Sequence, residues 1–124
     1  MGDFSLTTFS SKGRLLQIEY ALKAVSKGDT AIGIKGVNCV VLAVEKKMSS
    51  ILVETDSFHK INSICGHIGA VYAGLGPDYR VLIEKTRKYN QEYYMKYREP
   101  ILVSSLCRET AQIVQEFTQS GLYY

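Results

Sequence analysis

This 124-residue sequence lacks long apolar runs, a paired set of cysteines and a strong excess of one charge. No apolar run approaches the roughly 20 residues that cross a bilayer, so we expect no membrane-spanning segment and no membrane partner. The three cysteines lie far apart, which argues against a disulfide scaffold or a zinc ribbon, and we expect no metal and no cofactor. With 15 basic and 12 acidic residues the net charge is +3, too even a balance for a nucleic-acid-binding protein. The start has no basic-then-apolar signal pattern, so we expect the cytoplasm and nucleus.

The remaining composition is that of an ordinary globular chain, 46% hydrophobic and 22% charged. No proline-rich linker, low-complexity stretch or internal repeat divides it, which indicates one domain or a piece of one. Over residues 14–27 apolar side chains recur at spacings of three and four, which predicts an amphipathic helix. Lys27 and Gly28 are expected to end it, with Gly28 at the C′ position.

Strands are predicted next. The β-branched runs 30–35 and 39–44 flank Gly36-Val37-Asn38 and predict a hairpin. Because both runs are apolar at most positions, we expect this sheet to be covered on both faces. Residues 67–73 predict another buried strand.

Two helices follow. The first is predicted from Pro77 to about Arg98, because proline suits the first helical position and Glu99-Pro100 ends the pattern. The second is expected to begin after Ser104-Ser105 and to stop at Gly121. A helix, then strands, then two helices indicates an α/β or α+β chain.

The glycine loop Gly74-Leu75-Gly76 before the long helix invites a phosphate-binding interpretation. The third glycine of a dinucleotide-binding motif would fall at Tyr79, however, and no Gly-Lys-Ser/Thr follows. A structural turn is therefore favoured.

Lys60 stands among apolar residues, beside His59 and close to Phe58 and Ile61. A lysine in that setting can present its ammonium to a carboxylate. An exposed strand-edge lysine is an equally common alternative, and both interpretations stay open at this point.

Several stretches together are similar to one known family. Residues 4–10 and 13–21 closely resemble the N-terminal signature of eukaryotic 20S proteasome α-type subunits, and residues 41–47, 67–69, 76–82 and 115–121 match further. The stretches 5–10 and 76–82 are most similar to the type-2 branch of that family. The similarity extends over essentially residues 4–121.

The resemblance implies an α+β (αββα) fold, the N-terminal half of an N-terminal-nucleophile hydrolase sandwich. Residues 1–124 would form a single incomplete domain. It would comprise a gating tail (1–13), an N-terminal helix (14–27), antiparallel strands (30–73) and two helices (77–121). Since the family continues beyond the Thr-Gln-Ser-Gly stretch that ends here at Gly121, we expect the chain to be truncated after about half of the fold.

The resemblance also implies a non-catalytic structural and gating subunit of the 20S outer ring, acting in ring assembly, pore closure, activator docking and so ubiquitin-dependent protein degradation. Its partners would be other α subunits in a heteroheptameric ring, the β-subunit ring and activator particles. Lys60 is implied in activator docking, where its ammonium would receive a C-terminal carboxylate. Asp3, Glu19 and Tyr20 are implied in gating and ring contacts.

Two alternatives to this function remain. One is a threonine-type peptidase subunit of the same fold. Catalytic relatives use an N-terminal threonine whose own amine is the base, whereas the matching position here lies near Asp29 and the internal Thr30. No catalytic residue is therefore expected. The other alternative is a truncated fragment without an assembled function.

Overall fold

The computed structural model of the chain describes residues 9–48 and 50–120. In chain order the helices and strands are α1 (Leu16–Ser26), β1 (Ala31–Lys35), β2 (Val40–Val44), β3 (Ile61–Cys65), β4 (Ile68–Val71), α2 (Gly76–Tyr97) and α3 (Val103–Ser120), with a short 3₁₀ turn, η1 (Thr55–Ser57), between β2 and β3. The predicted order of a helix, strands and two helices is confirmed. In the stretches that the structure describes, no helix is both long enough and apolar enough to cross a membrane.

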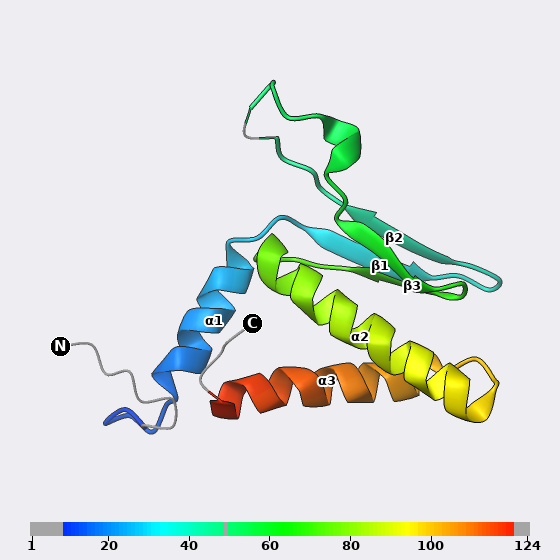
Figure 1. The fold of residues 1–124 in the computed structure, drawn as a ribbon. Helices are drawn as coiled ribbons and strands as arrows, with labels where there is room; N and C mark the ends of the chain where they lie inside the picture. The colour runs from blue at the N-terminus through cyan, green and yellow to red at the C-terminus, as the bar shows by residue number, and fades with distance from the viewer. Residues whose placement is uncertain (1–8, 49, 121–124) are drawn as a thin grey trace.

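The four strands form two separate two-stranded antiparallel sheets. β1 pairs with β2, from Ala31 opposite Val44 to Lys35 opposite Val40, as the predicted hairpin requires. β3 pairs with β4, and an irregularity between Ser63 and Cys65 shifts the register. Figure 1 shows α2 running beneath the strands, with α3 crossing it on the side away from them. Between β2 and β3 the chain leaves this body as a loop that carries η1.

The core lies where α2, α3 and β4 meet. Its buried apolar residues are Ile68, Tyr79, Ile83, Ile101 and Leu106. Thr86 is 2% exposed where α2 faces α3, and its hydroxyl lies 3.4 Å from that of Thr110. Arg87 ties α2 to β3 by donating from Nε and Nη2 to the Ser63 carbonyl, at 3.0 and 2.6 Å. Packing and side-chain hydrogen bonds thus join the long helix to both of its neighbours.

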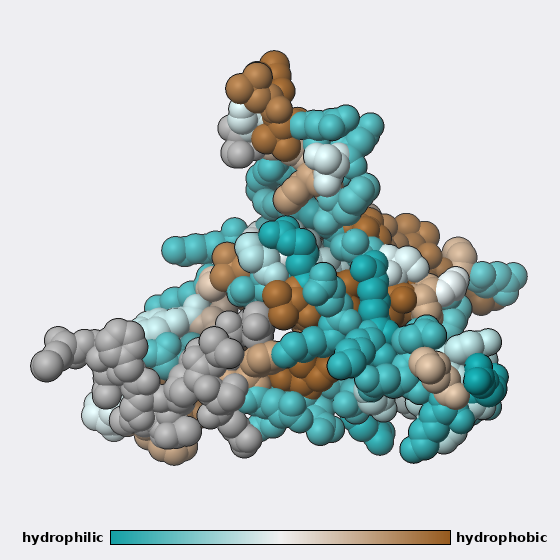
Figure 2. Space-filling model, in the orientation of Figure 1, coloured by the Kyte–Doolittle hydropathy of each residue, from teal (hydrophilic) through white to brown (hydrophobic). Residues whose placement is uncertain are grey.

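The β1–β2 hairpin differs from the prediction in its burial. On one face Ala31, Leu42 and Val44 are half-buried. On the other face, Ile32 and Ile34 of β1 remain 50% and 60% exposed. Val41, which pairs with Ile34, is 55% exposed, and apolar surface is visible along the hairpin in Figure 2. Coverage of both faces is therefore wrong for the part of the chain that is described, because nothing in it buries this second face.

Two helix boundaries were predicted near Pro100, and one of them is confirmed. α2 ends at Tyr97, and Arg98 takes a left-handed conformation with φ 58° while its N–H donates to the Tyr94 carbonyl at 2.8 Å, so the predicted end is confirmed. α3 begins at Val103, so a start after Ser104-Ser105 is wrong. The reason is that the Leu102 carbonyl already accepts from Ser105 and Leu106, at 3.1 and 3.0 Å, which places both serines inside the first turn.

Gly28 follows α1 but does not take the left-handed conformation expected of a C′ glycine. Among the described glycines only Gly13 and Gly74 have positive φ. Gly28 instead allows a close approach of two backbones, because a Cβ at this position would lie 2.9 Å from the Gly74 Cα and still closer to the Gly74 nitrogen. This glycine therefore brings the end of α1 against the loop before α2.

Candidate functional site

Lys60 directly precedes β3, and its side chain is almost completely enclosed. The residue is 5% exposed. Its ammonium donates to Oδ2 of Asp29 and to the carbonyl of Glu45, the latter at 2.8 Å. Asp29 precedes β1 and Glu45 follows β2, so the hairpin places both acceptors at one end of its strands. The Glu45 N–H donates to the Thr30 carbonyl at 3.0 Å and extends the pairing to that point.

The second carboxylate oxygen of Asp29 faces another cation. Lys47 Nζ lies 3.5 Å from Asp29 Oδ1 and 3.3 Å from Glu45 Oε2. The hydrogen bond from Lys60 lowers the pKa of Asp29 below its ordinary value of 3.8, against an opposing effect of burial. The hydrogen bond to Glu45, with the charges of Glu45 and Asp29, raises the pKa of Lys47. Two cations and two carboxylates therefore form one connected cluster of ion pairs.

The structure distinguishes the two interpretations of Lys60 that the sequence left open. An exposed strand-edge lysine is wrong, because this ammonium is enclosed and bonded to a carboxylate of the same chain. The Phe58 ring adds a cation–π contact at 5.8 Å from its centroid. A bond from Lys60 to the carboxylate of an activator stays a prediction.

The residues implied in gating and ring contacts lie elsewhere. Glu19 is in the first turn of α1, where its Oε1 lies 3.0 Å from Nη1 of Arg14. Tyr20 follows it and is 54% exposed. No hydrogen bond or ion pair joins either of them to Lys60 in the residues that the structure describes, and α1 lies apart from the start of β3 (Figure 1). Asp3 is outside the described residues.

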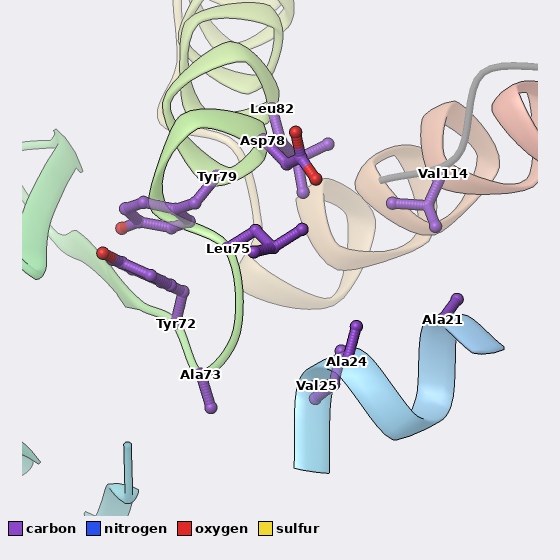
Figure 3. Close-up of a pocket in the computed structure, with 10 residues that line it drawn as sticks. All are labelled: Ala21, Ala24, Val25, Tyr72, Ala73, Leu75, Asp78, Tyr79, Leu82 and Val114. Atoms are coloured by element: carbon purple, nitrogen blue, oxygen red, sulfur yellow. The ribbon is translucent and has the colours of Figure 1, made fainter. Parts of the chain in front are cut away.

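A separate apolar cavity of about 250 Å³ opens between α1 and the start of α2. Figure 3 shows Ala21, Ala24 and Val25 of α1 on one side and Leu75 on the other. The stacked rings of Tyr72 and Tyr79, with centroids 4.2 Å apart, border it. Its lining is mostly apolar, with one carboxylate, that of Asp78.

The loop before α2 has a structural place in this arrangement. A Cβ at Gly74 would lie 3.6 Å from Val25 Cγ2, in ordinary contact with α1. Gly76 is already the first residue of α2. These contacts fit the structural turn that was favoured over a phosphate-binding loop. In the described ranges, no group of three or more histidine, cysteine or acidic side chains is placed to hold a metal ion.

Comparison with known families and proteins adds to this geometry. The model of the proteasome subunit family matches residues 25–123, and the model of the N-terminal signature of A-type proteasome subunits matches residues 3–24. The chain belongs to the proteasome subunit family. The described helices and hairpins are accordingly part of the α+β fold of N-terminal-nucleophile hydrolases, and the predicted fold class is confirmed.

Three similar proteins are alpha type-2 proteasome subunits. The chain is 58% identical to the alpha type-2 proteasome subunit of Oryza sativa subsp. indica over 125 residues, which is 98% of this chain and 53% of that protein. It is 56% identical to alpha type-2-A of Arabidopsis thaliana over the same shares. For alpha type-2 of Dictyostelium discoideum, identity is 58% over 95% of this chain and 50% of that protein. The resemblance to α-type subunits, and to type 2 in particular, is confirmed, and the chain spans about half the length of these curated relatives.

Sequence reasoning missed the partners of Lys60. Asp29 and Glu45 are 31 and 15 residues away from it, so no local spacing connects the three. A partial signal was available, because the predicted hairpin register already brings Asp29 near the segment from Glu45 to Lys47. Nothing in the pattern indicated that Lys60 would close the cluster.

Proposed function

We propose that this chain acts as a non-catalytic structural and gating subunit of the 20S outer ring. In this role it takes part in ring assembly, pore closure, activator docking and so ubiquitin-dependent protein degradation. Its partners are other α subunits in a heteroheptameric ring, the β-subunit ring and activator particles, and its compartments are the cytoplasm and nucleus. Similarity to alpha type-2 subunits over 98% of the chain supports this proposal.

The position of Thr30 supports the non-catalytic part. The nitrogen of Thr30 is bonded to Asp29 in the chain, whereas an N-terminal threonine nucleophile uses its own free amine as the base. The Thr30 carbonyl accepts the Glu45 N–H, so the pairing of the hairpin continues to this residue, just before β1. Lys60, the nearby cation, donates to Asp29 and Glu45.

The surface of α1 supports a place in an assembly, and it is the observation that carries the proposal. None of the residues of α1 is buried, although the helix has an apolar stripe. Leu22 is 64% exposed and Val25 49%. An amphipathic helix with so little covered apolar surface requires a neighbour, and an adjacent ring subunit supplies one.

Incorporation into particles tests this role. We expect an affinity-tagged chain to co-purify with α-type and β-type subunits in a particle detected by native mass spectrometry. Leu22→Glu should abolish incorporation because it places a charge on the uncovered stripe of α1. Met95→Glu is the matched control, since Met95 is 61% exposed on α2, and it should leave incorporation unchanged. A tagged chain found only outside particles, or equal behaviour of the two variants, contradicts the proposal.

Peptide hydrolysis by the same particles tests the non-catalytic assignment. Thr30→Ala should leave the turnover of fluorogenic peptides unchanged, because this hydroxyl has no free α-amine beside it. A selective loss of turnover, in particles that assemble to the same extent, would instead favour a threonine-type peptidase.

A further inference from the structure

We propose that Asp29 controls carboxylate binding at Lys60. The Asp29 carboxylate is hydrogen-bonded to the Lys60 ammonium. An incoming C-terminal carboxylate therefore binds Lys60 only by displacing Asp29. This inference rests on the proposed docking function and adds to it a residue that decides how readily docking occurs.

The enclosure of Lys60 is the first step in the argument. An ammonium has three donors, and two of them are directed to Asp29 Oδ2 and to the Glu45 carbonyl. The Lys60 side chain is only 6% exposed, so little of it remains for a third partner from solution. Adding a second carboxylate beside Asp29 would also bring two like charges together in a sheltered place, which is unfavourable. Exchange is therefore favoured over addition.

Asp29 is the acceptor that can leave. Glu45 uses its main-chain carbonyl, and its own N–H is bonded to Thr30 in the extended hairpin ladder. Asp29 uses a side chain that is 24% exposed and lies in the link between α1 and β1. Rotation of that side chain can break its bond to Lys60 without disturbing the sheet.

Lys47 makes the exchange electrostatically balanced. Its side chain is 67% exposed, and its ammonium already lies 3.5 Å from the other oxygen of Asp29. When an incoming carboxylate takes Lys60, Asp29 keeps Lys47 as its counter-ion. The incoming carboxylate is then paired with Lys60, while Asp29 and Glu45 share Lys47, so the buried ammonium is not left without a partner. An uncharged amide in place of the incoming carboxylate lacks the charge that this exchange requires.

Chemical acetylation of lysines in the whole chain, followed by mass spectrometry, measures the occupancy of Lys60. Lys88 is the internal reference, because its side chain is 79% exposed. A group that reacts only after local opening is slowed by the opening equilibrium, so we expect Lys60 to react at least about tenfold more slowly than Lys88. Asp29→Asn should raise the Lys60 rate by about tenfold, since the neutral amide holds the ammonium less strongly.

Glu45→Gln is the matched control. It removes the same unit of charge nearby, but the carboxylate of Glu45 is paired with Lys47, and only its main chain contacts Lys60. The Lys60 rate should therefore stay within about twofold of wild type in this variant. Equal rates in wild type and Asp29→Asn, or an equal increase in Glu45→Gln, overturn the assignment of Asp29.

A second arm uses N-acetyl-dialanine with a free carboxylate, and its C-terminal amide. In Asp29→Asn the free acid should slow acetylation of Lys60 by several-fold at concentrations that have no effect on wild type, and the amide should have none. If Asp29→Asn frees Lys60 but the acid gives no protection, docking at Lys60 and the competition are both wrong. If the acid protects Lys60 equally well in wild type and in the variant, docking stands and the inference about Asp29 is wrong.

Discussion

The region around α2 and the β1–β2 hairpin are both rich in apolar residues, yet they bury them to very different extents. Leu106 on α3 and Ile101 before it are each 2% exposed, because α2, α3 and β4 cover one another. Ile34 and Val41 form a cross-strand pair of similar apolar character, and more than half of each remains exposed. The comparison teaches that an apolar face shows where a partner is required, but it does not show which segment or chain supplies that partner.

Truncating one side chain around α2 and one on the hairpin should give the largest difference in stability. We expect Leu106→Ala to lower the free energy of unfolding by about 2–5 kcal/mol, because a buried leucine leaves a cavity. Val41 lies with Ile32 and Ile34 on the exposed face of the hairpin, called here the open face. Val41→Ala should change the free energy of unfolding by less than about 0.5 kcal/mol. Urea unfolding followed by helical circular dichroism measures both. Similar losses in the two variants would mean that the hairpin face is covered in solution.

A substitution at the contact between α1 and the loop before α2 should have the next largest effect on stability. Gly28→Ala should destabilise the chain by about 1–3 kcal/mol, because its Cβ would meet the Gly74 backbone. Gly66→Ala is the control, since a Cβ there meets nothing within 4 Å and its φ is not in the left-handed region. We expect the control to be neutral or stabilising by up to about 1 kcal/mol. Equal melting temperatures for the two variants would contradict the close approach at Gly28.

Charging the open face should change association more than stability. Val41→Lys places a cation on the uncovered side of the hairpin, where flat apolar strands favour pairing with other chains. We expect it to reduce the mean particle size in light scattering, with a change of less than about 0.5 kcal/mol in unfolding free energy. Val37→Lys, at the 99% exposed hairpin turn, should reduce association less. If neither Val41→Lys nor Val37→Lys changes association, the open face does not mediate contacts between chains.

The smallest expected effect is on the pH dependence of folding stability. The folded pKa of Asp29 is lowered from its ordinary value of 3.8, so its pair with Lys60 contributes stability above that pH and loses it as pH falls through the folded pKa. Asp29→Asn should therefore show a shallower loss of stability than wild type below about pH 4. Unfolding midpoints at neutral and acidic pH measure the difference. Parallel pH curves for the two proteins would mean that the pair does not contribute.

Local patterns predicted the helices well. The helical repeat is a local property of the sequence, and helices α1, α2 and α3 are all present where helices were predicted. The bounds of β3 are not evident from the sequence, because two polar residues interrupt the apolar run in Ile61–Cys65. Coverage of the hairpin on both faces was predicted wrongly, because the burial of Ile34 depends on what packs against it rather than on its own apolar run.

The candidate site was predictable only in part. Lys60 was identified as unusual from its apolar neighbours, and the structure buries it at one end of a partly exposed cluster of charged side chains. Its bond to Asp29 spans 31 residues and depends on where the chain returns after the excursion that contains η1. The close approach at Gly28 is similarly a property of two backbones meeting, which no single stretch encodes.

The pairing of strands with their immediate neighbours has a consequence for synthesis. In the part of the chain that the structure describes, each sheet pairs two strands that follow one another in sequence, β1 with β2 and β3 with β4. Pairings that close short loops form quickly, and domains fold as the ribosome releases them from the N-terminal side. Each hairpin can thus be completed during translation, before α2 and α3 emerge. The face of β1–β2 that carries Ile32, Ile34 and Val41 is then exposed from the moment the hairpin forms.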